Sequence, residues 1–62
     1  SYKALSALYV GRYDDMTEPY FAMMDEIKKI GGKFSGISYE YYLSDEEIPE
    51  EQQETIMELV YE

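Results

Sequence analysis

The pattern of apolar residues predicts one helix, from about residue 16 to residue 30. Apolar side chains recur there at intervals of three and four residues, which is the repeat of a single helix face. These positions are Met16, Tyr20, Met23, Ile27 and Ile30. The segment therefore has one broad apolar face that can pack against another layer.

Both ends of this segment carry helix-boundary signals. Asp15 or Thr17 is the predicted N-cap, and Pro19 is tolerated because it falls in the first turn. At the other end, Gly31 and Gly32 follow the last apolar residue, and glycine readily takes the left-handed conformation that ends a helix. The sequence thus predicts a helix that stops at the glycine pair.

Three further segments alternate between two sets of side chains and predict β-strands. They are residues 4–10, residues 34–43 and residues 55–61. In the second segment one set is apolar, and the other is mixed and comprises Ser38, Glu40 and Tyr42. Glutamates around the third segment also allow a helix there, but its alternation favours a strand.

The order of these elements predicts the fold class. Strand, helix, strand and strand make an α+β fold, with one helix on a three-stranded antiparallel or mixed sheet, in a single domain of residues 1–62. Residues 44–53 are polar and contain Pro49, so they predict a solvated loop with room for a short helical turn. A three-stranded sheet leaves its other face and its edges uncovered, and a second copy of the chain would protect them.

The charge balance excludes several classes of ligand and chemistry. The chain has 14 Asp and Glu against 5 Lys and Arg, a formal net charge of −9, so we expect no direct binding to nucleic acid. It has no Cys and no His, which excludes disulfides, zinc sites built from these residues, and imidazole or thiol catalysis. The acidic residues of the 44–53 loop lack the spacing and the central glycine of an EF-hand. We expect no metal or other cofactor.

Tyrosine is the unusual part of the composition. The chain has 8 Tyr, 2 Phe and no Trp, more aromatic residues than a minimal core requires. Tyrosine offers a flat apolar ring with a polar tip, which suits a wet pocket or an interface. No apolar run approaches the roughly 18 residues of a membrane span, and no signal segment opens the chain. We therefore expect a soluble, cytoplasmic protein with no membrane partner.

Three stretches, in this order along the chain, resemble one domain family. Residues 9–16 resemble its strand that ends in a Gly-Pro-Tyr turn, residues 19–32 its Tyr-containing helix that stops at Gly, and residues 38–45 its Tyr-Glu-x-Tyr strand that runs into an Asp. The family is the gyrase-inhibitor-like (GyrI-like) effector-binding domain, which also forms part of bacterial transcription activators that sense drugs or metabolites. The resemblance covers nearly the whole chain. Arg12 and Val60 stand where the family usually has Pro, and the helix lacks a Trp often present near its end.

This resemblance implies both a function and an assembly. GyrI-like domains contain two strand-helix-strand-strand modules related by a pseudo-twofold axis, and this chain resembles only the second. Either two copies pair as a homodimer and complete one pocket, or a single module serves another purpose. The implied ligand is a small molecule, in the first place a lipophilic cation. Any role in transcription would need a separate DNA-binding regulator.

Glu40 is the first candidate ligand-binding residue. The strand alternation puts it on one face with Tyr42, and a carboxylate among tyrosine rings attracts a lipophilic cation through charge and cation–π contact. In the family that the chain resembles, the matching Glu lies in the ligand pocket. The supporting candidates are Tyr42, Tyr13, Tyr20 and Tyr9. The alternative for Glu40 is a solvated position on an open strand, and for the tyrosines it is ordinary packing.

Two other function classes stay open. Some GyrI-like proteins are hydrolases, which implies Glu40 as a general base with a tyrosine as proton donor, although this chain has neither His, Cys nor Trp. A third class is an acidic protein-interaction module, such as a mimic that occupies the nucleic-acid-binding surface of gyrase. The methionines would suit an adaptable pocket, but helical spacing favours a core role for Met16, Met23 and Met24.

Overall fold

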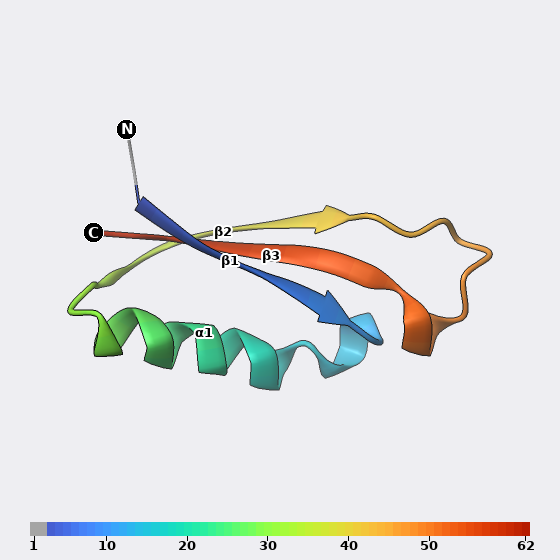
Figure 1. The fold of residues 1–62 in the computed structure, drawn as a ribbon, viewed down its shortest axis with the longest axis horizontal. Coiled ribbons are helices and arrows are strands. Elements are labelled where there is room, and N and C mark those ends of the chain that lie inside the picture. The colour runs from blue at the N-terminus through green and yellow to red at the C-terminus, as the bar shows by residue number, and fades with distance from the viewer. Residues whose placement is uncertain (1–2) are drawn as a thin grey trace.

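The computed structural model describes residues 3–62, which form one α-helix and three β-strands (Figure 1). The elements are β1 (Lys3–Val10), α1 (Thr17–Lys29), β2 (Phe34–Tyr42) and β3 (Glu54–Tyr61), with short 3-10 helices at Tyr13–Asp15 and Glu50–Gln52. The predicted α+β class, the element order and the antiparallel sheet are confirmed. The third alternating segment is a strand and not a helix, and a short helical turn lies in the polar loop.

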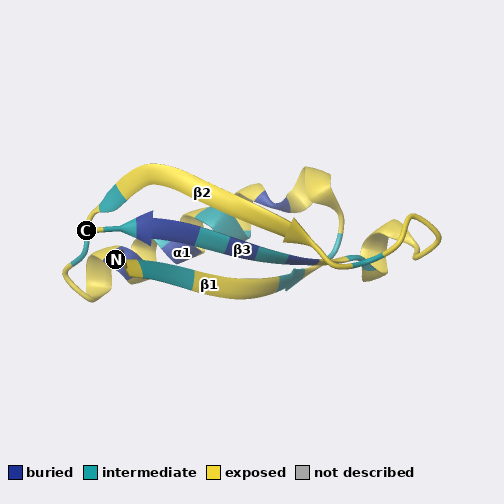
Figure 2. Cartoon of the chain, turned by 90° about the horizontal axis from the view of Figure 1, so that it is seen from above, coloured by how far each residue is buried: buried dark blue, intermediate teal, exposed yellow. Residues whose placement is uncertain are grey.

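The last strand of the chain lies in the middle of the sheet. The strand order is β1-β3-β2, and both outer strands run antiparallel to β3. Leu59 of β3 lies opposite Leu5 on one side and Ser38 on the other. Figure 2 shows that burial is concentrated along β3, while β2 is exposed over most of its length. Both β1 and β2 are edge strands.

The core lies between α1 and one face of the sheet. Ile27 of the helix and Met57 and Leu59 of β3 are almost fully buried, and Met16 and Met23 complete the cluster. The predicted helix stripe is thus confirmed for Met16, Met23 and Ile27, whereas Ile30 at its end is 59% exposed and lies outside the core. The hydroxyl of Thr55, also buried on β3, has no hydrogen-bond partner within residues 3–62. A core of so few side chains leaves the domain only marginally stable.

The start of the helix differs from the sequence prediction. Neither Asp15 nor Thr17 caps it: Met16 is the N-cap, with φ −81° and ψ −6°, and it makes no side-chain capping bond. Asp15 belongs instead to the preceding 3-10 helix, and this turn brings Met16 into the core. Burial of an apolar side chain has taken the place of a polar cap.

The end of the helix matches the prediction at the glycine pair. Gly31 has φ +80°, in the left-handed region that suits glycine. Its N–H donates to the Lys28 carbonyl at 3.0 Å, and the N–H of Gly32 donates to the Ile27 carbonyl at 2.9 Å. These two bonds are the Schellman arrangement, which satisfies carbonyls left over at the helix end.

A bulge near the start of β2 shifts its pairing with β3. Phe34 lies opposite Tyr61, but Ser38 lies opposite Leu59, so the irregularity falls between Phe34 and Ser38. The Ser35 hydroxyl spans it, donating to the Val60 carbonyl at 2.8 Å and accepting from the N–H of Ile37 at 3.2 Å. Because their partners Tyr61 and Leu59 lie on the same face of β3, Phe34 and Ser38 both stay on the helix side, and the mixed set of β2 stays there with Ser38.

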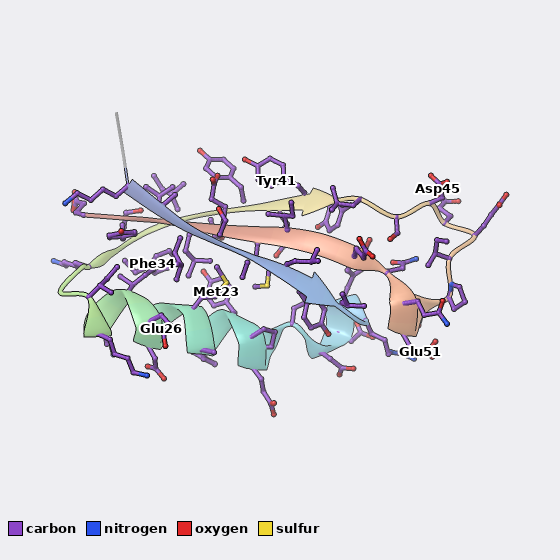
Figure 3. The ribbon with its side chains drawn as sticks, in the orientation of Figure 1. Met23, Glu26, Phe34, Tyr41, Asp45 and Glu51 are labelled. Atoms are coloured by element: carbon purple, nitrogen blue, oxygen red, sulfur yellow. The ribbon has the colours of Figure 1, made fainter. Side chains whose placement is uncertain are left out.

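The other face of the sheet has no second layer within residues 3–62. Figure 3 shows Met23 and Phe34 between the helix and the sheet, whereas Tyr41 points away on the far side. Six large apolar side chains of this outer face are about half exposed: Leu8, Val10, Ile37, Tyr39, Tyr41 and Leu43. Glu58 lies among them and accepts hydrogen bonds from the Tyr41 hydroxyl at 3.1 Å and the Ser6 hydroxyl at 3.5 Å. We call this surface the outer face.

The length of α1 also bears on whether the chain could cross a membrane. Across residues 3–62, no helix has the length and apolar character needed to cross a membrane.

Candidate functional site

The candidate site is a groove between the beginning of α1 and the face of β2 that the helix covers, which we call the inner face. A cavity of about 260 Å³ lies there. Its lining residues are Tyr13, Met16, Thr17, Tyr20, Phe21 and Glu40. It joins one carboxylate to three aromatic rings and a methionine, which is the mixture expected for a ligand that is apolar over most of its surface and positively charged.

Local structure explains why these residues meet. Glu40 lies opposite Met57 in the sheet, so its side chain leaves β2 on the side that the helix covers. The chain turns after Gly11, where φ is +150°, and enters the 3-10 helix that carries Tyr13. The helix then begins beside β2, and its first turns supply the remaining walls.

Glu40 and Tyr42 form a direct pair on the inner face of β2. The Tyr42 hydroxyl donates a hydrogen bond to Glu40 Oε1 at 2.7 Å. This bond, together with the negative charge of Glu40, raises the pKa of the Tyr42 phenol above its ordinary value of 10.0, because losing the proton would place two negative charges side by side. The phenol therefore stays a hydrogen-bond donor at neutral pH.

Tyr13 completes the group by holding the Tyr42 ring. The two rings make an edge-to-face contact, with centroids 5.0 Å apart and planes at 64°. Both side chains remain about half exposed, Tyr13 at 48% and Tyr42 at 60%, so the contact leaves ring surface available to a ligand. The structure thus brings together three of the predicted residues, Glu40, Tyr42 and Tyr13, of which Glu40 and Tyr13 line the cavity and Tyr42 lies behind them outside its lining.

Tyr20 serves both the core and the groove. Its ring packs edge to face against Phe34 at 6.1 Å and against Phe21 at 6.5 Å, and the side chain is half-buried against the core cluster. It also lines the cavity beside Glu40. Tyr20 therefore fits both interpretations, because it packs against the core and also forms part of the groove wall.

Tyr9 lies apart from the groove. It is on β1, at the opposite edge of the sheet from β2, and is not among the residues that line the cavity. Its ring is half-buried against the core, and its hydroxyl donates to the Arg12 carbonyl at 2.8 Å. The geometry gives Tyr9 a role in packing and in fixing the turn after β1.

Sequence reasoning missed two residues that line the groove. Thr17 and Phe21 were not among the candidates, although Phe21 follows Tyr20 directly on the helix and is 59% exposed. The available signal was that Phe21 widens the apolar stripe beyond the positions that the three-and-four spacing needs for the core. Of the methionines, Met16 lines the cavity, while Met23 and Met57 are enclosed in the core.

The acidic residues outside the groove form no comparable site. Arg12 bridges two of them, with Nη1 3.2 Å from Glu50 Oε2 and Nη2 3.8 Å from Asp14 Oδ2. Across the described residues, no three acidic side chains gather closely enough to hold a metal ion. A hollow beside the helix start, of about 290 Å³, is lined by Asp14, Asp15, Thr17 and Glu18 and has no aromatic wall.

No family model, no curated protein and no solved structure matches the chain.

Proposed function

We propose that the chain is a small-molecule-binding module that takes a lipophilic cation in the groove between α1 and β2. The observation that carries this proposal is the placement of the exposed Glu40 carboxylate at an open groove walled by Tyr13, Tyr20 and Phe21. Glu40 forms no ion pair with a Lys or Arg of residues 3–62, so its charge is left for a ligand. Ring faces and a carboxylate attract the same kind of molecule, an aromatic or aliphatic cation.

The resemblance to GyrI-like domains supports the same ligand class. In that family the matching glutamate lies in the pocket, and here the residue at that position lines the cavity. We take the module to act in the cytoplasm, an expectation that rests on the sequence alone. A response in transcription would require a separate DNA-binding regulator that senses the loaded module.

A fluorescence titration with proflavine, a flat monocation, tests the proposal. We expect saturable binding that weakens about fivefold in Glu40→Gln, because the variant keeps the size of the side chain and removes its charge. Acridone, a neutral molecule of the same three-ring shape, should bind more weakly than proflavine to the wild type. Glu58→Gln is the matched control, since Glu58 lies on the outer face.

Either of two results would contradict this proposal. One is proflavine binding that Glu40→Gln leaves unchanged while Glu58→Gln reduces it. The other is equal affinity of the wild type for proflavine and acridone, which would mean that charge contributes nothing. Circular dichroism of each variant shows whether the fold is retained.

We also propose that a second copy completes the pocket along the free edge of β2. The cavity of about 260 Å³ is smaller than the roughly 300–1,000 Å³ of ordinary small-molecule sites. The N–H of Leu43 donates to the Glu54 carbonyl of β3, so on β2 the alternate N–H groups of Ser38, Glu40 and Tyr42 point to the free edge. Antiparallel pairing of two such edges would place a second wall beside Glu40.

A protein-interaction module is the second candidate, and the outer face is the observation that favours it. Six apolar side chains of this face are about half exposed, and a gathering of exposed apolar side chains is typical of an interaction surface. In this case the outer face, and not the edge of β2, would be the contact surface. Glu40 would then have no part in binding.

Two substitutions separate these surfaces by sedimentation equilibrium. Ser38→Pro removes an N–H from the free edge of β2, where proline is tolerated, and should halve the mass of the assembly and weaken proflavine binding. Leu8→Glu puts a charge on the outer face and should leave the mass of the assembly and the affinity for proflavine unchanged. A mass that falls in Leu8→Glu and stays constant in Ser38→Pro would favour the protein-interaction module.

A further inference from the structure

The two oxygens of the Glu40 carboxylate are not equivalent. Oε1 accepts the hydrogen bond from the Tyr42 hydroxyl at 2.7 Å. Oε2 has no hydrogen-bond or ion-pair partner within the part of the chain that the structure describes. A ligand in the groove therefore meets a carboxylate with one oxygen already engaged in a hydrogen bond and the other open.

The Tyr42 hydroxyl is held in this position from two sides. Its own bond to Glu40 is short, and the Tyr13 ring meets the Tyr42 ring edge to face at a centroid distance of 5.0 Å. Glu40 and Tyr42 are also two residues apart on one strand, so the pleat puts both side chains on the same face. Removing Tyr42 from Oε1 would cost a charge-assisted hydrogen bond and disturb a ring contact.

This arrangement bears on which cations fit. A guanidinium binds a carboxylate best through two parallel N–H bonds, one to each oxygen, whereas an ammonium needs only one oxygen. Because a carboxylate oxygen can accept two hydrogen bonds, a guanidinium that bonds both oxygens must share Oε1 with the Tyr42 hydroxyl or displace it, and either loss weakens its second bond. An ammonium on Oε2 suffers neither loss, because it leaves the Tyr42 hydroxyl where it is.

We propose that Tyr42 is a positioning residue that leaves Oε2 as the preferred acceptor of Glu40, so that the groove selects ammonium cations over guanidinium cations. The inference rests on the proposed cation-binding function and adds a specificity to it. The ligand class is accordingly a lipophilic amine, carrying its charge on one nitrogen beside an apolar ring system. Tyr42 acts through Glu40 and fixes which oxygen the ligand uses.

Two probes with the same ring system test the selectivity. They are 2-naphthylmethylammonium and 2-naphthylmethylguanidinium, each measured by displacement of proflavine from the whole chain. The wild type should prefer the ammonium probe. Tyr42→Phe frees Oε1 and should shift the affinity ratio toward the guanidinium probe by about threefold to tenfold, the value of one hydrogen bond. Tyr39→Phe is the matched control, because Tyr39 lies on the outer face of the same strand.

A second readout separates positioning from simple packing. Saturation with tetraethylammonium, which keeps its charge throughout the titration and does not absorb where tyrosinate is read, should lower the pKa of the Tyr42 phenol toward its ordinary value, because the bound cation offsets the Glu40 carboxylate whose hydrogen bond and charge raise it. Ultraviolet titration of tyrosinate, compared between the wild type and Tyr42→Phe, isolates this phenol. A Tyr42 that only filled space would show no such change on binding.

The results distinguish this inference from the proposed function. If Glu40→Gln weakens both probes but Tyr42→Phe leaves their ratio as in the wild type, the selectivity is wrong and the cation site stands. If the wild type binds neither probe nor proflavine, both proposals are overturned. A ratio that shifts in Tyr42→Phe and not in Tyr39→Phe supports the anchor as described.

Discussion

Ile27→Ala is expected to leave a large part of the chain unfolded at room temperature. Ile27 is 0% exposed and packs from the helix against the buried side chains of β3. Truncating a buried Ile to Ala costs about 2–5 kcal/mol of unfolding free energy, through lost burial and the cavity left behind. The core of a domain this small rarely supplies more than about 3–5 kcal/mol in total, so one such change removes most of the stability.

Urea unfolding followed by circular dichroism measures this effect. Ile30→Ala is the control, because it makes the same change three residues further along and its side chain is 59% exposed. It should change the unfolding free energy by less than about 0.5 kcal/mol. Equal midpoints for the two variants would show that the contact between α1 and β3 does not hold the fold together.

The alternation and the helix boundaries carried most of the fold prediction. A strand repeat of two residues assigns each side chain to a face, and a glycine pair stops a helix through its backbone, so both signals are local. The strand order β1-β3-β2 could not be predicted from local patterns, because it depends on which strands pair with each other in the folded chain. The N-cap prediction was wrong for a related reason: the 3-10 turn at Asp15 lets Met16 reach the core, and the sequence window around it does not show that core.

In the candidate site, too, local relations were predictable from the sequence and long-range contacts were not. Glu40 and Tyr42 share a face because they are two residues apart on a strand, and the structure puts them in one hydrogen-bonded pair. Tyr13 and Phe21 come from the turn and the helix, and their meeting with β2 depends on the path of the chain between β1 and α1. The alternation of side chains along β2 also did not decide which of its two sets faces the helix. In the structure the mixed set faces the helix, and the apolar set lies on the outer face.

Gly32→Ala is the second substitution with a large expected effect, and its cause is steric. A Cβ at this position would lie 2.6 Å from Cδ2 of Tyr61 and 3.1 Å from Cγ2 of Ile27. The aromatic ring of Tyr61 and the buried Ile27 both belong to the packing around the core, so relief of the overlap moves the end of α1 away from the sheet. We expect a loss of about 1–3 kcal/mol in unfolding free energy, the usual cost of overpacking.

The neighbouring glycine provides the contrast that identifies this cause. Gly31 has φ +80°, but a Cβ at this position would have no heavy atom within 4 Å, so its constraint is conformational and not steric. Asn accepts left-handed backbone better than other residues, and Gly31→Asn should therefore cost less than Gly32→Ala in the same urea titration. If the two losses were equal, or Gly31→Asn were the larger, the backbone conformation of the helix end would matter at least as much as the contact of Gly32 with Tyr61. In the expected order, close packing of the chain against Tyr61 is what requires glycine at position 32, while the left-handed turn alone requires it at position 31.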